Sequence, residues 1–335
     1  MTAPPLIFKV FGRAFVLLAM TVALLALGVS FSSGNLLVPA MAQVDRSLEG
    51  DKNCTVCHDA DWKPAVLTIY QTKHGVKGDE RTPGCQSCHG ASAEHQKDPS
   101  NKSPDINFGA KSKKLSPVAA RNAVCLSCHE FRILTRTNWS GSQHETRGVA
   151  CSDCHDAHAP TQRVFDKLTQ PEVCFACHKA QRAQIQRFSR HPIAAGKVTC
   201  SDCHNPHGST GPTLLVKNSV NETCYTCHAE KRGPFLWEHA PVVDDCTNCH
   251  MPHGSNMWAL LKARPPMLCQ NCHSGDHGKN LYSAGNLPRG NVTTANGRIP
   301  LGSQSPPAQE NSRGCVACHS LIHGSNHPAG AKFQR

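Results

Sequence analysis

The sequence predicts a chain of short helices and irregular loops with little β structure, built around covalently attached groups in place of an aliphatic core. Three observations lead to this prediction. A Cys-x-x-Cys-His motif occurs ten times in 335 residues and uses all 20 cysteines. Aromatic residues make up only 5% of the chain, and 25 Gly and 23 Pro interrupt any long periodic run. The polypeptide alone is therefore a poor core former.

The motif indicates haem. Its two thiols add across the vinyl groups of a haem, and the histidine that follows takes one axial position on the iron. Disulfide frameworks and zinc ribbons also use Cys-x-x-Cys pairs, but neither requires a histidine after every second cysteine. The expected fold class is a multihaem cytochrome c with ten covalently attached haem c groups. The attachment cysteines are Cys54, Cys57, Cys85, Cys88, Cys125, Cys128, Cys151, Cys154, Cys174, Cys177, Cys200, Cys203, Cys224, Cys227, Cys246, Cys249, Cys269, Cys272, Cys315 and Cys318.

The haems would supply the missing apolar surface, so haem attachment and folding are expected to be coupled. They also change the charge. The formal net charge is +11, and loss of a leader carrying Lys9 and Arg13 leaves +9. Each ferric bis-histidine haem contributes about −1 when both propionates are ionised. The loaded protein is then close to neutral, and nucleic-acid binding is not expected.

Residues 1–42 are expected to be a cleaved signal peptide. Lys9 and Arg13 form a basic region, Ala14–Val29 is apolar, and Ala40-Met41-Ala42 is a cleavage site of small residues. The alternative is an uncleaved membrane anchor, because the apolar stretch approaches the length that spans a bilayer. Cleavage leaves a decahaem cytochrome c domain at 43–335. Export fits this chemistry, because haem attachment of this type takes place on the outer side of the bacterial inner membrane.

The motifs fall into five tandem di-haem units at about 43–110, 111–165, 166–215, 216–260 and 261–335. The first motifs of these units begin at 54, 125, 174, 224 and 269, and the central spacings are 49 and 50 residues. Such regularity is typical of an array of like units, here an elongated one. Each of the first four units has two histidines that follow a cysteine pair and two that do not, which is the number of ligands that two bis-histidine haems require.

The expected proximal ligands are the histidines of the motifs: His58, His89, His129, His155, His178, His204, His228, His250, His273 and His319. The expected distal ligands are His74, His95, His144, His158, His191, His207, His239, His253, His277 and His323. The fifth unit has one histidine more than it needs. Position in the repeat favours His277 and makes His327 the spare, although the long gap before Cys315 leaves this choice open.

Helical segments are expected at Pro171–Arg190 and Ser219–Lys231, and a turn at Asn205-Pro206-His207-Gly208. Two segments break the regular spacing, Gln96–Val124 and Gly278–Gly314, and their Gly, Asn, Pro, Ser and Lys content is typical of surface loops. Such loops are either docking surfaces or simple insertions.

Filled axial positions favour conduction over catalysis. A substrate cannot reach a bis-histidine iron without displacing a ligand, and such centres exchange single electrons. No motif ends in Lys and no unit lacks a distal histidine, so an enzyme is not expected. Direct reduction or oxidation of iron at an exposed haem would still be feasible, because outer-sphere transfer needs no open site.

Three stretches resemble a known family: Ser201–Ser209, Asn221–Val242 and His323–Pro328. They are similar to the MtrA/DmsE family of periplasmic decahaem cytochromes c, and the short distance between Gln43 and Cys54 resembles its short, MtrA- and MtoA-like members. The resemblance implies a rod of ten bis-histidine haems inside an outer-membrane β-barrel porin. Its implied partners are that porin, periplasmic or inner-membrane c-type cytochromes, and an extracellular multihaem cytochrome.

The direction of electron flow stays open between metal reduction and Fe(II) oxidation, because a conductor follows the potentials at its ends. A soluble periplasmic carrier that donates to a reductase, as in a dimethyl sulfoxide reductase system, is the alternative function. A multihaem oxidoreductase with its own substrate is a third possibility and would require a high-spin haem.

Overall fold

The computed structural model describes residues 49–76, 78, 82–109, 114–129, 138–273, 290–294, 297–301, 314–328 and 330–333. All of them belong to the compact unit Ser47–Arg335. The expected signal peptide and His277 lie outside the described residues. Within the described ranges, no helix has the length and hydropathy needed to cross a bilayer.

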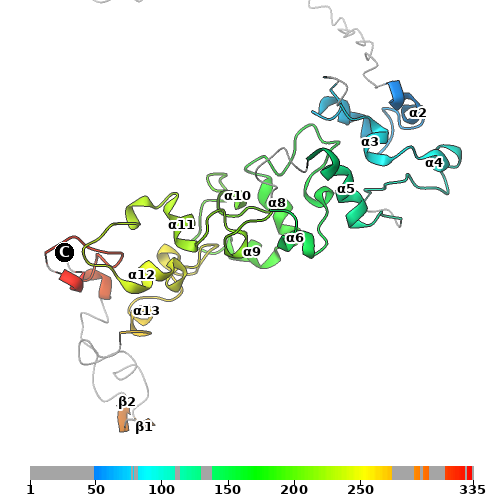
Figure 1. The fold of residues 1–335 in the computed structure, drawn as a ribbon. Helices are drawn as coiled ribbons and strands as arrows, with labels where there is room; N and C mark the ends of the chain where they lie inside the picture. Colours follow the sequence, from blue (N-terminus) through cyan, green and yellow to red (C-terminus); the bar gives the residue numbers. More distant parts are fainter. Residues whose placement is uncertain are drawn as a thin grey trace, which may run out of the picture. The chain divides into compact units, whose positions relative to one another are not determined.

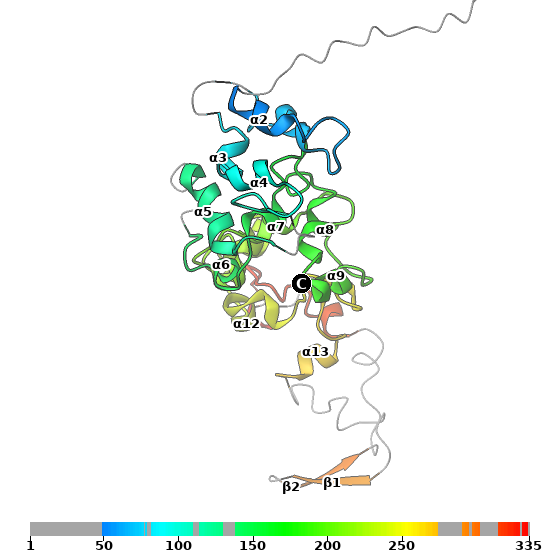
Figure 2. The ribbon, with the colours of Figure 1, turned by 90° about the vertical axis from the view of Figure 1, so that its right-hand side faces the viewer.

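Short helices joined by irregular segments make up most of the described chain (Figure 1). The α-helices are α2 (Lys52–Thr55), α3 (Cys85–His89), α4 (Ala93–Lys97), α5 (Val118–His129), α6 (Gln143–Thr146), α7 (Cys151–Cys154), α8 (Gln170–Phe175), α9 (Lys179–Gln184), α10 (Cys200–Cys203), α11 (Val220–Tyr225), α12 (Ala240–Asp244) and α13 (Met267–Gln270). The 3-10 helices are Glu49–Asp51, Val66–Gln71, Pro212–Leu214, Ala229–Lys231, Cys246–Asn248, Trp258–Leu260, Cys315–Ala317 and Gly330–Lys332. The strands β1 (Gly290–Thr294) and β2 (Gly297–Leu301) pair antiparallel (Figure 2).

The two motifs of a unit lie on different helices, the first near the C-terminal end of its helix and the second at the N-terminal end of its own. The first motif starts near the C-terminal end of a helix, as Cys174 does in α8, whereas the second starts its helix, as Cys200 does in α10. The second type of helix is capped by the motif itself, because the carboxylate of Asp202 accepts a hydrogen bond from the Thr199 backbone N–H at 2.7 Å. The residue after the second cysteine, His204, is already extended, at φ −119° and ψ 140°.

The prediction of one continuous helix at Pro171–Arg190 is wrong. The segment is broken into α8 and α9 around His178, whose φ of −85° and ψ of 63° are not helical. Ser219–Lys231 is broken in the same way at His228, with φ −102° and ψ 49°. The motif histidine leaves the helix in both places, which a periodicity argument does not register. The expected turn at 205–208 is confirmed, since the Gly208 N–H donates to the Asn205 carbonyl at 3.1 Å.

The two segments expected to be loops contain regular structure. The end of Gln96–Val124 belongs to α5, which begins at Val118. Gly278–Gly314 contains the β1–β2 pair, with Val292 opposite Ile299. The sequence carries a signal for this hairpin, because Asn296-Gly297, a dipeptide typical of tight hairpin turns, follows the β-branched run Val292-Thr293-Thr294.

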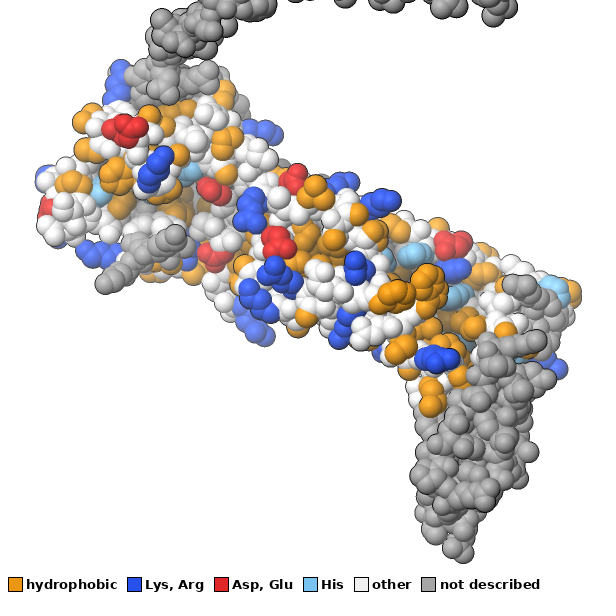
Figure 3. All heavy atoms as spheres, turned by 180° about the vertical axis from the view of Figure 1, so that it is seen from behind, with side chains coloured by type: hydrophobic (Ala, Val, Ile, Leu, Met, Phe, Trp, Pro, Cys, Tyr) orange, Lys and Arg blue, Asp and Glu red, His pale blue; other side chains and the backbone are white. Residues whose placement is uncertain are grey.

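The apolar core formed by the polypeptide is small. Its main cluster consists of Phe175, Ile185 and Ile193, with Val198 packed against it. Large apolar side chains elsewhere are exposed, including Trp258 at 78% and Leu236 at 75%. Hydrophobic side chains are spread over the face in Figure 3, between Lys and Arg side chains. The described chain thus leaves much apolar surface for another group to cover.

Candidate haem-binding sites

A large cavity connects the first six motifs. Its volume is about 3640 Å³, and it is lined by every cysteine and every proximal histidine of motifs one to six. Its walls are mainly apolar apart from these thiols and imidazoles. Sites are numbered here from one to ten in the order of their motifs. A cavity of this size, with sulfur and imidazole at regular intervals, suits several macrocycles in sequence.

Within a unit, the first cysteines of the two motifs are neighbours. Burial and the adjacent Cys246 thiol raise the pKa of Cys224 to about 12. Burial and the Cys315 thiol raise the pKa of Cys269 to about 11. A hydrogen bond between thiols likewise joins Cys54 to Cys85 and Cys174 to Cys200. These thiols become thioethers once haem is attached, so their proximity places the two attachment sites of a unit next to each other.

Between units, the second cysteines are neighbours. The pKa of Cys88 is raised by burial and then by the Cys128 thiol of the following unit. Corresponding pairs, again with burial as the larger cause of the raised pKa, are Cys154 with Cys177, Cys203 with Cys227, and Cys249 with Cys272. First-to-first contacts within units and second-to-second contacts between units alternate. The attachment sites therefore follow one another in the order of the chain.

The histidines form nine pairs with nearly equal spacing. The centroids of the two rings are 6.0–6.4 Å apart in every pair. The pairs are His58–His95, His74–His129, His89–His158, His144–His178, His155–His207, His191–His228, His204–His253, His239–His273 and His250–His323. Each pair joins one expected proximal ligand to one expected distal ligand.

This spacing fits an iron between two imidazoles. With a metal–nitrogen distance of about 2 Å on each side, and about 1.1 Å from each nitrogen to its ring centre, the centroids would be about 6.2 Å apart. Burial lowers the pKa values of His89, His253 and His323 and so favours the neutral imidazole that binds metal. We infer that each pair binds one haem iron.

The outer nitrogens of these imidazoles are held in place. Nδ1 of nine histidines donates to a backbone carbonyl at 2.5–3.1 Å, which leaves Nε2 to face the iron. These histidines are His89, His95, His144, His158, His191, His204, His239, His250 and His319. His58 differs, because its Nδ1 is buried with no hydrogen-bond partner among the described residues.

Distal histidines serve neighbouring units. In eight of the nine pairs the two histidines come from different units, and only His58–His95 lies within one. A distal histidine that precedes the second motif pairs with the next unit, as His191 does with His228. One that follows the second motif pairs with the preceding unit, as His253 does with His204. An internal unit therefore contains the four histidines that two haems require, but its two distal histidines pair with motif histidines of the neighbouring units and not with its own.

The tenth pair includes His319. Its predicted partner, His277, lies outside the described residues, and the alternative, His327, is described. The exchange pattern favours His277. In the first unit the histidine with no preceding unit to serve, His95, pairs with its own unit. His277 is the corresponding histidine of the fifth unit, which contains the last two of the ten motifs. The assignment of His277 to His319 stays a prediction.

A recurring His-Gly-Ser sequence docks the third, fourth and fifth units onto the units before them. It occurs at His207-Gly208-Ser209, His253-Gly254-Ser255 and His323-Gly324-Ser325. A Cβ on Gly254, at φ +149°, would lie 2.1 Å from the Gln184 carbonyl oxygen, so only glycine permits this approach. The adjacent serine then pairs with the earlier unit through its backbone, as Ser255 does with Ser189. The sequence analysis missed this role, although the repeated tripeptide was visible.

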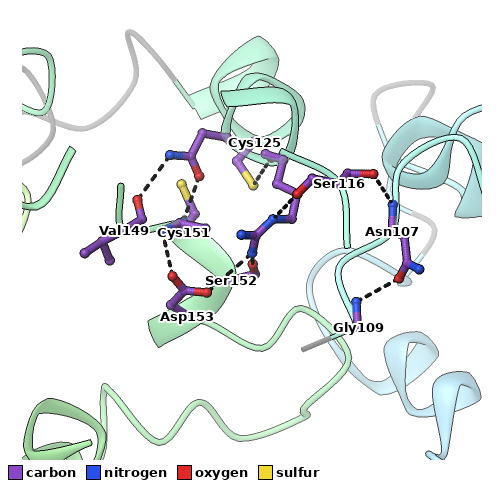
Figure 4. Close-up of polar contacts among 11 residues, drawn as sticks. Asn107, Gly109, Ser116, Cys125, Val149, Cys151, Ser152 and Asp153 are labelled. Atoms are coloured by element: carbon purple, nitrogen blue, oxygen red, sulfur yellow. Dashed lines mark hydrogen bonds and ion pairs between the residues drawn. The ribbon is translucent and has the colours of Figure 1, made fainter. Parts of the chain in front are cut away.

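A polar side chain links the two motifs within a unit. Three residues before the first motif, Asn122 and Asn221 accept hydrogen bonds from the backbone N–H groups of Cys151 (2.9 Å) and Cys246 (2.7 Å). Figure 4 shows the contacts to Cys151 and Val149. The neighbouring Arg121, 4% exposed, contacts Ser152 and Asp153 from the same helix, α5. These linking residues were also missed, because an isolated asparagine carries no signal until the repeats are aligned.

The comparisons with known proteins agree with this chemistry. The model of the doubled CXXCH motif matches residues 191–233 and 239–278, and the model of cytochrome c-type proteins that are NrfB-like matches residues 85–169. The multiheme cytochrome MtrA of Shewanella baltica (strain OS185) is 43% identical over 300 residues, which cover 88% of this chain and 84% of that protein.

Proposed function

The chain belongs to the MtrA family of multihaem c-type cytochromes, which transfer electrons, and from this premise we propose that it conducts electrons through an outer-membrane porin. The conduit links periplasmic electron carriers to iron or other metals outside the cell. It holds ten haems, each bound by two cysteines and two histidines. Haem c, when bound, supplies one-electron exchange between Fe(III) and Fe(II).

The observation that carries the proposal is the serial order of the attachment sites. Cys54 adjoins Cys85 and Cys88 adjoins Cys128. In the second unit Asn122 links the two motifs, and from Cys154 and Cys177 the alternation of thiol contacts continues to Cys269 and Cys315. A soluble shuttle needs one or a few centres. Ten sites in chain order are what transport of charge from one end of a polypeptide to the other requires.

The ligand pairs support conduction over catalysis. In the nine described pairs the ring centroids are 6.0–6.4 Å apart, so each pair of imidazoles would hold one haem iron and would leave it no position for a substrate. The Nδ1 hydrogen bonds hold the rings in orientation, as that of His191 to the Pro252 carbonyl at 2.8 Å does. A rigid ligand shell of this kind limits reorganisation between the two oxidation states.

In this proposal the protein works in the periplasm, which the expected leader and the family support, and its partner is a β-barrel porin of the outer membrane. Periplasmic or inner-membrane c-type cytochromes exchange electrons at one end. Metal, directly or through an extracellular multihaem cytochrome, does so at the other. The direction follows the potentials at the two ends, so metal reduction and Fe(II) oxidation use the same structure.

The test is electron transfer across a membrane. The loaded protein and its candidate barrel are assembled in liposomes that contain a reduced internal donor, and an impermeant ferric acceptor is added outside. We expect oxidation of the donor only when both proteins are present. A matched variant with Cys224→Ala and Cys227→Ala lacks the seventh attachment site, and transfer through it should be largely lost because the series is interrupted.

Assembly without transfer would contradict the conduit and favour the alternative, a free periplasmic carrier that donates to a reductase. Undiminished transfer in the variant lacking the seventh site would contradict the serial arrangement. Haem content and the low-spin spectrum are measured on the same samples, so that failure to load haem is distinguished from failure to conduct.

A further inference from the structure

The first unit differs from the second and fourth at the residue that links its two motifs. Its linking residue is Asp51, whose Oδ1 accepts a hydrogen bond from the Cys85 backbone N–H at 2.7 Å. Asn122 and Asn221 occupy the equivalent position, three residues before the first motif, in the second and fourth units. An aspartate therefore makes, in one unit, the contact that a neutral amide makes in two others.

The surroundings of Asp51 are adapted to a carboxylate. Asn221 donates its amide N–H groups to the backbone carbonyls of Val242 and Val243, both at 2.9 Å. A carboxylate has no such donor to offer. In the first unit a hydroxyl takes the place of the carbonyls, and Tyr70 Oη donates to Asp51 Oδ2 at 2.9 Å. Both oxygens of Asp51 thus act as acceptors, which is the hydrogen-bonding pattern of the ionised form.

The charge is buried, and no cation among the described residues forms an ion pair with it. Asp51 is 2% exposed and Tyr70 is 8% exposed. Among the residues that the structure describes, the ion pairs do not include Asp51. The corresponding part of the second unit instead contains Arg121, which pairs with Asp153 at 3.4 Å. A carboxylate shielded from water, with no counter-charge, acts over a longer distance than one on the surface.

The negative charge of Asp51 acts on one cysteine of each haem attachment site in the first unit. The pKa of the Cys54 thiol is raised by burial and then by Asp51. The pKa of the Cys85 thiol is raised to about 12, by burial first and then by the same carboxylate. These two sulfurs belong to the first and second motifs. Any charge that develops at either site is therefore subject to Asp51.

We propose that the buried carboxylate of Asp51 lowers the reduction potentials of the first two haems. The proposal rests on the assignment of sites one and two to bis-histidine haems. Ferric haem carries one more positive charge than ferrous haem, so a fixed negative charge nearby stabilises the ferric state. The first pair of the array is then harder to reduce than the pair of the fourth unit, where Asn221 is neutral. Asp51 is a positioning and tuning residue, since it touches the attachment segment and not the iron.

The expected effect follows from Coulomb's law. One unit charge at a separation of about 12 Å in an effective dielectric constant near 20 changes a one-electron equilibrium on the order of tenfold. A tenfold change corresponds to about 59 mV for a one-electron couple. Removal of the charge should raise the potentials of about two of the ten haems by that order and leave the others nearly unchanged.

The test uses the complete, haem-loaded protein and the substitution Asp51→Asn. The new amide still accepts from Cys85 and donates to the Tyr70 oxygen, so only the charge is removed. The optical redox titration is compared with that of the unmodified protein, and about a fifth of its amplitude should move to higher potential. Asp51→Ser is a second neutral variant with the same expected shift. Asp51→Glu retains the charge and should titrate like the unmodified protein.

Haem content and the low-spin spectrum are determined first. Fewer than ten low-spin haems in the unmodified protein would count against the proposed ligand assignment and not against Asp51. With loading intact, neutral variants that titrate like the unmodified protein would overturn the proposal. Neutral variants that lose the first or second haem would also overturn it, because Asp51 would then have a structural role and no tuning role.

Discussion

The exchange of distal ligands between units predicts a specific outcome for two double variants. His253 pairs with His204 of the preceding unit at 6.0 Å, whereas its own unit's His250 pairs with His323 at 6.1 Å. His250→Ala combined with His253→Ala should therefore remove one ligand from each of two haems, the eighth and the sixth. His204→Ala combined with His253→Ala should remove both ligands from the sixth haem alone.

The magnitude follows from the count of sites. Each bis-histidine haem contributes about a tenth of the low-spin signal of a ten-haem protein, and a haem that loses one imidazole becomes high-spin or binds a weaker ligand. The first double variant should lose about two tenths of the low-spin signal, and the second about one tenth. The two variants carry the same number of histidine-to-alanine changes, so a general loss of stability would affect them similarly.

Near-infrared magnetic circular dichroism measures the low-spin fraction, and the total haem content normalises it. His327→Ala serves as the control and should leave the signal unchanged. Ligation within units would reverse the result, with one haem affected in the first double variant and two in the second. That reversal would refute the exchange of ligands that the ring pairs indicate.

Three further predictions concern the ends, the docking contact and the linking residues. His277→Ala should convert one haem to high-spin, whereas His327→Ala should not; the opposite result in the same spectrum would assign the tenth site to His327. Gly254→Ala should lower the melting temperature and convert the sixth haem to high-spin, because the left-handed backbone costs about 1 to 2 kcal/mol and the backbone clash adds about 1 to 3 kcal/mol. Gly141→Ala, at φ +77° with no atom within 4 Å of its Cβ, should show only the first cost, and equal melting temperatures would contradict the docking role of Gly254. Asn221→Ala should destabilise the fourth unit by about 2 kcal/mol, since one backbone N–H and two carbonyls lose their partner, and an unchanged denaturation midpoint would show that the link is dispensable.

The sequence was sufficient to predict the chemistry of the sites but not their connectivity. Cys-x-x-Cys-His contains its own attachment chemistry, so the positions of thiols and proximal histidines follow directly from local spacing. The partner of each imidazole does not, because His191 is close in sequence to His178 and His204 yet pairs with His228. Pairing depends on how one unit packs on the next, and that packing uses glycine and serine positions with no metal-binding chemistry of their own.

The same distinction explains the errors in secondary structure. Composition correctly predicted short helices, but the apolar pattern at Pro171–Arg190 favoured one helix where His178 interrupts it. The geometry of the haem motif decides the backbone there, and helix propensity is the weaker influence. The β1–β2 hairpin was missed for the opposite reason, because a local Asn-Gly signal was outweighed by the loop-like composition around it.

The exchange of ligands also explains why the two irregular segments lie in the first and last units. An internal unit sends its distal histidines to both neighbours, but each end unit has one histidine with no neighbour to serve. In the first unit that histidine is His95, and the segment that follows it holds it in place: the Lys102 carbonyl accepts from His95 Nδ1 at 2.7 Å, and Asp105 accepts from the Ser92 backbone N–H at 2.8 Å. The extra residues after His95 thus supply the contacts that a neighbouring unit supplies elsewhere.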